Sequence, residues 1–298
     1  VPVAELSGSS SRRRPSLRQE PDREGTQVRP VSIHKQVTVL PHSTKTELHF
    51  VPRANVGRAG GGTSREEWVV ARPDSVSLDW AEMDPVPVRV SKGTPRGRAT
   101  PAMYFWQRTK SHVWCESQTE KSEVMWLDYG GQVERMWSQP FAVVFGHDTT
   151  MARRWHVPDF LAELADGRMC ALDVRPKELV QPDDRRKFDA TADVCSALGW
   201  GYQLLTGHDR NATDVLRWLA ASRHQRCAPP THVEDQLLAL ARHGATRRAL
   251  CQAVSPKCPP LACAWVDHLA WHGRLRVDLH LRFDSNTIYS TADEQVRR

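Results

Sequence analysis

The residues whose types and spacing could carry chemistry lie in the stretch HVPDFLAELADGRMCALDVRPKE, positions 156 to 178. Asp159 and Asp173 flank two apolar runs that are joined by the turn dipeptide Asp166-Gly167, a signal typical of a β-hairpin. A two-residue turn would place the two aspartates on opposite faces of the hairpin. A three-residue loop, with Gly167 in the left-handed position of a G1 bulge, would set Asp159 directly across from Asp173.

The three-residue loop is the alternative with chemical consequences. Two carboxylates about 5 Å apart repel each other unless a proton or a cation lies between them. A hard divalent ion suits such an oxygen-rich site, and Mg²⁺ is usually held by one or two carboxylates together with phosphate oxygens of the substrate. Mg²⁺ or Mn²⁺ there would lower the pKa of a bound water and neutralise charge on phosphorus. The competing interpretation is an ordinary solvated hairpin.

Two basic residues follow the second aspartate. Side-chain alternation puts Arg175 on the face of Asp173. Lys177 shares this face if the strand continues, whereas Pro176 favours an earlier end of the strand. Either cation could orient the attacking water or stabilise the charge of a pentacovalent phosphate.

Helical and strand patterns surround this hairpin and must position it. Residues 117–129 indicate a helix whose first turn carries the capping-box pair Ser117 and Glu120. The pattern of residues 132–145 and of 202–206 is typical of strands, and residues 184–200 predict an amphipathic helix. The order helix, strand, hairpin, helix, strand predicts an α/β domain over residues 101–210, with a mixed sheet flanked by helices.

The two ends of the chain differ from this middle part. Residues 1–100, with many Pro, Gly, Ser and Arg residues, predict a mostly disordered basic segment. In the C-terminal part, helical patterns at 212–225, 233–254 and 260–273 precede a two-stranded ribbon within 274–291, with a tight connection at residues 243–245. This order predicts a small winged-helix-like domain over residues 211–298.

Composition narrows the class of protein and its partners. The chain has 41 Lys and Arg against 35 Asp and Glu, and this excess favours a polyanionic partner such as DNA. Arginine pairs at 153–154, 185–186 and 247–248 fit either a DNA-facing surface or solvated helix surfaces. No apolar run approaches the roughly 18 to 20 residues of a membrane helix, and no secretory signal is seen. The seven cysteines include no CxxC pair and are expected to be free thiols in a reducing cytoplasm.

These motifs resemble those of the TnsA-type transposase endonuclease subunits and, more broadly, of the restriction-endonuclease-like nucleases. The similarity rests on HVPDF followed by DVRPKE, preceded by a helix ending in LDY and by SQPF, and it runs from residue 115 to 205. It continues more weakly in LAWHGRLRVDL. The resemblance implies a metal-dependent endonuclease that cuts one strand of double-stranded DNA at each transposon end, beside a separate transposase subunit and its ATPase regulator.

The family motif is Pro-Asp, a spacer and Asp/Glu-x-Lys, joined by an acidic residue of the preceding helix. By resemblance, Asp159 and Asp173 are metal ligands, and Glu120 is the acidic residue of the helix. Glu116 and Glu123 are nearby alternatives, and Glu120 completing only the helix cap is the competing interpretation.

The motif's lysine is Arg175 in this chain. Arginine stays protonated and cannot act as a general base, although it can hold a phosphate; Lys177 is the other candidate. Gln139 either shapes the approach to the site or ends a strand, and His156 either contacts a phosphate or has a structural role. The arginine leaves open a catalytically silent nuclease fold that serves DNA binding and assembly; a stand-alone restriction or repair nuclease is a third hypothesis.

Overall fold

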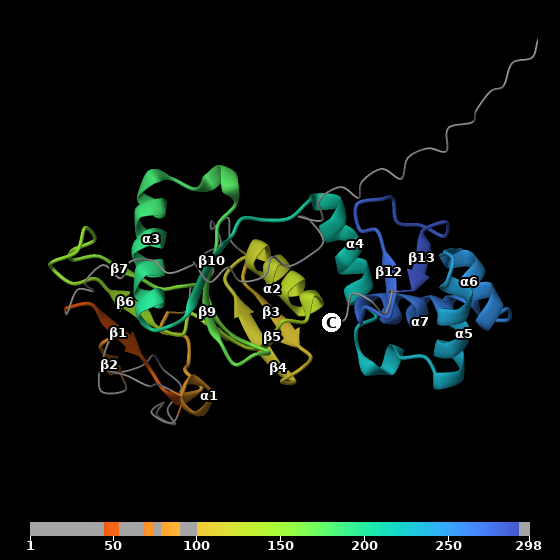
Figure 1. The fold of residues 1–298 in the computed structure, drawn as a ribbon, viewed down its shortest axis with the longest axis horizontal. Coiled ribbons are helices and arrows are strands. Elements are labelled where there is room, and N and C mark those ends of the chain that lie inside the picture. Colours follow the sequence, from red (N-terminus) through yellow and green to blue (C-terminus); the bar gives the residue numbers. More distant parts are fainter. Residues whose placement is uncertain (1–44, 54–67, 74–78, 90–99, 292–298) are drawn as a thin grey trace, which may run out of the picture.

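The chain is described by a computed structural model (Figure 1). The described residues are 45–53, 68–73, 79–89 and 100–291. Most of the segment predicted to be disordered therefore lies outside the described residues. Its described parts contain β1 (Glu47–Phe50), β2 (Val69–Ala71) and α1 (Trp80–Met83). The prediction missed these elements, whose side chains Leu48, Phe50 and Trp80 are buried in an apolar cluster.

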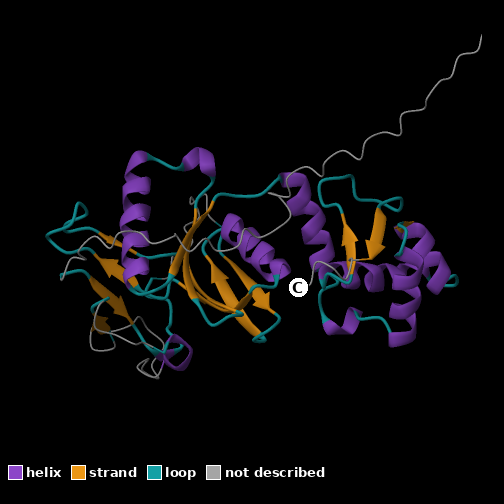
Figure 2. Cartoon of the chain, viewed as in Figure 1, coloured by secondary structure: helices purple, strands orange, loops and turns teal. Residues whose placement is uncertain are grey.

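A four-stranded mixed sheet of order β10-β9-β8-β5 forms the centre of the molecule (Figure 2). Its strands are β5 (Val133–Ser138), β8 (Phe160–Leu164), β9 (Met169–Val174) and β10 (Gly201–Leu205). Strand β10 runs parallel to β9, and the other neighbours are antiparallel.

Two helices cover opposite faces of this sheet. They are α2 (Gln118–Gly130) and α3 (Pro182–Ala197). Phe160 of β8 belongs to the same apolar cluster as Trp126 of α2, whereas the next residue, Leu161, belongs to the cluster of Val194 in α3. Successive side chains of a strand point to opposite faces, so each helix has its own face. The predicted mixed sheet packed between helices is confirmed.

The hairpin of β8 and β9 has the three-residue loop. The N–H of Leu164 donates to the carbonyl oxygen of Arg168 over 2.8 Å, and Gly167 has a φ of +80°. Continuing the observed register by one position sets Asp159 opposite Asp173. The loop alternative with chemical consequences is therefore the one that the structure contains.

Helix α2 starts at the predicted position. It follows a hairpin of β3 (Ala102–Trp106) and β4 (Ser111–Cys115). Ser117 is its N-cap and accepts a hydrogen bond from the N–H of Glu120 over 3.1 Å. This cap fixes the first turn of the helix, and with it the direction in which Glu120 leaves the backbone.

Residues 132–145 were predicted as one strand but form two strands in different sheets. After β5 the chain turns into β6 (Ala142–Val144), which belongs to a second sheet of order β2-β1-β6-β7, where β7 is Trp155–His156. The break falls at Gln139, whose φ is +40°, and at Pro140, which has no N–H for a strand ladder. Pro140 was the signal in the sequence that could have indicated this break.

The C-terminal part of the chain is a helical unit with a small sheet. Its helices are α4 (Arg210–Ala220), α5 (Thr231–Ala241), α6 (Arg247–Val254) and α7 (Pro259–Trp271). Its strands are β11 (Ala245–Thr246), β12 (Leu275–Val277) and β13 (Ile288–Thr291), in the order β11-β13-β12. The tight connection predicted at residues 243–245 is present, and β11 in it adds a third strand to the predicted ribbon.

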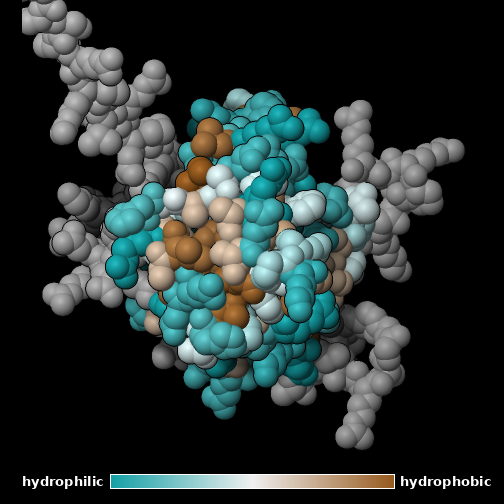
Figure 3. All heavy atoms as spheres, turned by 90° about the vertical axis from the view of Figure 1, so that its right-hand side faces the viewer, coloured by the Kyte–Doolittle hydropathy of each residue, from teal (hydrophilic) through white to brown (hydrophobic). Residues whose placement is uncertain are grey.

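The C-terminal unit packs directly against α2. One apolar cluster extends from Trp126 of α2 to Leu216 of α4 and Val266 of α7, and the indole N–H of Trp126 donates to the hydroxyl of Thr213 over 3.2 Å. The apolar core thus crosses the boundary predicted near residue 210. Figure 3 looks onto the outer end of this unit and shows apolar side chains surrounded by polar ones. Among the described residues, no helix has the length and hydropathy of a membrane span.

The loop conformation gives a first testable prediction. Gly167 has a positive φ, and no atom lies within 4 Å of the place where a Cβ would be. A substitution there should therefore cost backbone strain and no steric clash. Gly167→Ala should lower the free energy of unfolding by about 1 kcal/mol. Gly167→Asn should cost less, because asparagine adopts the left-handed region more readily. Urea unfolding measures both, and equal stability of the alanine variant and wild type would contradict the assignment.

Candidate metal centre

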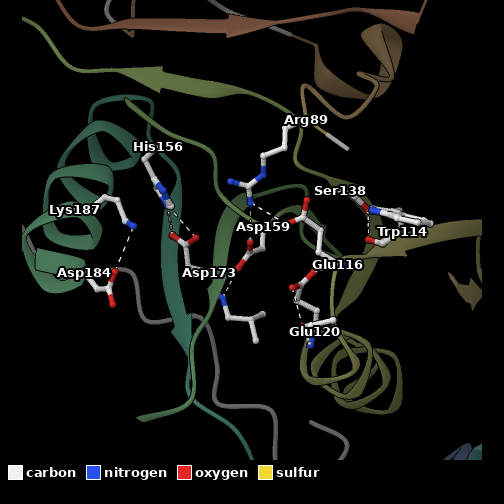
Figure 4. A network of polar contacts seen from close by, with 12 residues as sticks. Arg89, Trp114, Glu116, Glu120, Ser138, His156, Asp159, Asp173, Asp184 and Lys187 are labelled. Atoms are coloured by element: carbon white, nitrogen blue, oxygen red, sulfur yellow. Dashed lines mark hydrogen bonds and ion pairs between the residues drawn. The ribbon is translucent and has the colours of Figure 1, made fainter. Parts of the chain in front are cut away.

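Three carboxylates meet where the inner strand β8 of the central sheet begins (Figure 4). Asp159 directly precedes β8, Glu120 lies in the first turn of α2, and Glu116 directly follows β4. One oxygen of each lies within 4.8 Å of the corresponding oxygens of the other two. Among the described residues, this is the group of acidic, histidine or cysteine side chains that could hold a metal ion.

Glu120 completes the helix cap and also belongs to the acidic cluster. Its Oε2 accepts a hydrogen bond from the backbone N–H of Glu116 over 2.7 Å, and its Oε1 accepts from the Ser117 hydroxyl over 2.9 Å. The two interpretations of Glu120 are thus compatible, because the same bonds that tie it to the helix start hold its carboxylate beside Asp159. Glu116, named only as an alternative, joins the cluster, whereas Glu123 forms an ion pair with His208 over 3.2 Å.

Asp159 is held by the strand that it faces. Its Oδ2 accepts a hydrogen bond from the N–H of Val174 at the end of β9 over 2.8 Å. Burial, and then the negative charges of Asp173 and Glu120, raise the pKa of Asp159 well above its ordinary value. Burial also raises the pKa of Glu120. These carboxyls resist ionisation unless a cation compensates their charge.

Asp173 is placed beside this cluster and is bound by other partners. Its side chain is 2% exposed. The Tyr202 hydroxyl donates to its Oδ2 over 2.6 Å, and His156 Nε2 lies 2.9 and 3.0 Å from its two oxygens. The structure therefore brings Asp173 close enough to affect the pKa of Asp159 but not into the group of converging oxygens. His156, at the end of β7, is thereby bonded to a proposed site residue, and this contact is compatible with both of its interpretations.

The two predicted cations, Arg175 and Lys177, do not lie beside the acidic cluster. Strand β9 ends at Val174, although the N–H of Arg175 still donates to the carbonyl oxygen of Leu205 in β10 over 2.9 Å. The side chain of Arg175 lies on the side of α3, the helix that covers the face of Ala171 and therefore of Asp173, but it does not reach the carboxylates of the cluster. The Arg175 Nε donates to the carbonyl oxygen of Leu179 over 3.3 Å, and its Nη2 lies 3.4 Å from Asp184 at the start of α3. Lys177 is an exposed residue in a short 3₁₀ helix, Lys177–Leu179. The strand therefore ends before Pro176, which was the alternative to a strand that continues to Lys177.

A different cation, Arg89, reaches the carboxylates. Its Nη2 lies 3.0 Å from Oε2 of Glu116 and 3.9 Å from Oδ1 of Asp159, and Figure 4 shows its side chain pointing at both. Arg89 was not among the predicted site residues, because residues 1–100 were predicted to be mostly disordered. The alternation of Val86 and Val88 in PVPVRV was the signal that could have indicated an extended segment there.

Gln139 connects Arg89 to the site through its backbone. Its N–H donates to the carbonyl oxygen of Asp159 over 2.9 Å, and its own carbonyl oxygen accepts from the N–H of Val88 over 2.9 Å. The side chain is 0% exposed, and neither its amide oxygen nor its nitrogen has a hydrogen-bond partner among the described residues. Its positive φ is the backbone strain that often marks such sites.

Several arginines of the predicted pairs form contacts within the chain. Arg247 forms two hydrogen bonds to Asp267, of 3.1 and 2.6 Å. Arg186 pairs with Asp183, which also lies 3.9 Å from Arg154. Arg247 is thus a structural residue of the C-terminal unit and not a free phosphate contact.

The oxygen-only set of Glu116, Glu120 and Asp159 has the donor chemistry that Mg²⁺ and Mn²⁺ prefer. Carboxyls with raised pKa values bind a divalent ion with release of protons, so binding should strengthen as the pH rises. No protein-family model matches the sequence, and no curated protein is significantly similar to it.

The raised pKa of Asp159 predicts how stability depends on pH. Between the ordinary carboxyl pKa of about 4 and the raised value, the folded state binds more protons than the unfolded state. The stability of the metal-free protein should therefore fall as the pH rises through this window. Asp159→Asn removes the charge and keeps an acceptor for the Val174 N–H. It should raise the melting temperature of the metal-free protein at neutral pH and reduce its pH dependence.

The matched control is Asp166→Asn in the loop of the same hairpin. Hydrogen bonds from Arg168 lower the pKa of Asp166, so this change should give no stabilisation. Adding MgCl₂ or MnCl₂ should raise the melting temperature of wild type and of Asp166→Asn, and that of Asp159→Asn much less. Destabilisation of the metal-free protein by Asp159→Asn at neutral pH would contradict this electrostatic account.

Proposed function

We propose that this protein is a Mg²⁺- or Mn²⁺-dependent endonuclease that hydrolyses a phosphodiester of double-stranded DNA. The observation that carries the proposal is the convergence of Glu116, Glu120 and Asp159 at the end of the inner strand β8, one strand away from Asp173 in β9. The order of α2, β5, the β8–β9 hairpin, α3 and β10 supports a restriction-endonuclease-like domain. In such nucleases, by resemblance, the hairpin and the preceding helix supply the acidic residues.

Glu120 and Asp159 would hold the ion, with Glu116 as a third oxygen ligand. The ion when bound supplies an acidified water and positive charge for the phosphate. The protein's own residues do the positioning: the Val174 N–H fixes one oxygen of Asp159, and the Ser117 cap fixes Glu120. Carboxylates held in this way need little reorganisation when a phosphate arrives.

Asp173 has a supporting role in this proposal. Tyr202 and His156 bind its oxygens, and its charge disfavours ionisation of Asp159 without a metal. A divalent ion would relieve this repulsion, so ionisation of the carboxyls and binding of the ion should occur together.

The partners follow from the resemblance and from surface chemistry. We propose that the substrate is DNA at transposon ends and that the protein acts beside a transposase subunit and an ATPase regulator. The helix order α5, α6, α7 and the sheet order β11-β13-β12 support a winged-helix-like C-terminal domain. Helix α7 contains no lysine or arginine, and Leu240 and Leu261 are exposed in this unit. The two exposed leucines favour a protein partner over DNA for the surface that carries them.

A catalytically silent subunit for DNA binding and assembly is the second candidate. The observation in its favour is that Arg175, at the position of the motif's lysine, is engaged with Leu179 and Asp184. A decayed site should also have lost its metal.

Metal binding separates these candidates. We expect calorimetric titration with MnCl₂ to show one binding event for wild type, and we expect Glu120→Gln and Asp159→Asn to weaken or abolish it. Asp166→Asn is the matched control and should bind as wild type does. Absence of carboxylate-dependent binding would favour the silent subunit.

Nicking of a supercoiled plasmid in MnCl₂ tests the activity itself, with the transposase partner present and absent. Asp159→Asn and Glu120→Gln should lower the nicking rate by about 10²-fold or more, because several kcal/mol of charge stabilisation at the phosphate would be lost. Asp166→Asn should keep the rate, and circular dichroism should show that all variants are folded. A wild-type rate for folded Asp159→Asn would reject the proposed site.

A further inference from the structure

We propose that Arg89 is the cation of this site that contacts the scissile phosphate, in the place that the motif's lysine would occupy. The inference rests on the proposed nuclease function and assigns that site a residue that comes from outside the nuclease motif.

Arg89 is next to the carboxylates that would hold the metal. Its Nη2 lies 3.0 Å from Glu116 and 3.9 Å from Asp159. A group at this distance from two metal-ligand oxygens also lies next to any phosphate that shares the ion with them. The guanidinium fork can bind a phosphate with two parallel N–H bonds while remaining close to a carboxylate.

The side chain has both exposure and an unused donor. Arg89 is 39% exposed, so a polyanionic substrate can approach its guanidinium from solvent. Its Nε is buried and has no hydrogen-bond partner among the described residues. A buried donor without a partner costs free energy, and a phosphate oxygen bound to the guanidinium fork would supply that partner.

The backbone that carries Arg89 is fixed to the site. The N–H of Val86 donates to the carbonyl oxygen of Val51 over 3.0 Å, and the N–H of Val88 donates to that of Gln139 over 2.9 Å. Gln139 is in turn bonded to Asp159. The segment before Arg89 is therefore held by two backbone hydrogen bonds. The second of them, to Gln139, connects it to Asp159.

The residues after Asp173 do not offer this contact. Arg175 is bound to Leu179 and lies near Asp184, so its guanidinium points to the start of α3. Lys177 lies in the exposed 3₁₀ helix. Of the basic side chains in the described residues, Arg89 is the one that forms ion pairs with Glu116 and Asp159.

A counter-ion without a substrate contact is the alternative that the test must separate. A counter-ion would change metal affinity and stability but would not change the turnover of the metal-saturated enzyme. A phosphate contact would change turnover at saturating metal and would also change DNA binding. Both readouts are therefore needed.

The 298-residue chain and its Arg89→Ala, Arg89→Lys and Arg168→Ala variants should be compared in plasmid nicking at saturating MnCl₂. We expect Arg89→Ala to lose on the order of 10²-fold in rate, as when one preorganised donor is removed, with partial rescue by added guanidinium ion. Arg89→Lys should retain more activity than Arg89→Ala, because a point charge remains. Arg168→Ala, which removes an exposed arginine of the hairpin loop, should keep the wild-type rate.

Arg175→Ala provides the direct comparison between the two candidate cations. It should lose less activity than Arg89→Ala. A wild-type rate for Arg89→Ala, or a larger loss for Arg175→Ala, would overturn the inference while leaving the metal-dependent activity established.

If wild type does not nick DNA, the proposed function is rejected. Binding of a short DNA duplex in CaCl₂ then still tests the contact of Arg89 with phosphate. Arg89→Ala should then bind the duplex more weakly, and its salt dependence should fall by about one unit of log slope. Arg168→Ala should bind as wild type does. Unchanged affinity and slope for Arg89→Ala would overturn the phosphate contact irrespective of activity.

Discussion

Repulsion between carboxylates withdrawn from water is the constraint on which this structure depends. Glu116, Glu120 and Asp159 converge within a few ångströms at the partly buried start of the inner strand β8, and Asp173 lies in the neighbouring strand. Burying several like charges is unfavourable unless hydrogen bonds and cations compensate them. The chain supplies the Val174 N–H, the Ser117 cap and Arg89. The pKa of Asp159 nevertheless remains raised, so the compensation is incomplete, and a divalent ion would complete it.

The fold positions this cluster through a few local devices. The three-residue loop at Gly167 sets the register that brings Asp159 opposite Asp173. The N-cap of α2 directs Glu120 toward the same place, and the apolar faces of β8 and β9 fix the sheet between α2 and α3. The strained turn at Gln139 separates two sheets and ties the Arg89 segment to Asp159. The loop and the helix cap are local in the sequence, whereas the packing of the sheet and the bonds of Gln139 join distant segments.

The parts of the site that depend on local rules could be predicted from the sequence. The Ser117 cap and the end of β9 before Pro176 follow from capping and the missing N–H of proline. The hairpin itself follows from the Asp-Gly turn signal, but turn chemistry left its loop length open. Arg89 could not be found in this way, because its segment acquires its position only from bonds to Val51 and Gln139, which are distant in sequence. The end point of the Arg175 side chain has the same origin, because its contact with Asp184 of α3 is tertiary and side-chain alternation gives only the face of the strand.

The central claim is that Glu120 and Asp159 hold a divalent ion at the start of β8. Anomalous diffraction from crystals soaked in MnCl₂ tests it most directly, because manganese is located by its own scattering. The account predicts one strong peak within coordination distance of carboxylate oxygens of Glu120 and Asp159, and its loss in crystals of Asp159→Asn. A manganese peak elsewhere, or the same peak in the Asp159→Asn variant, would contradict it.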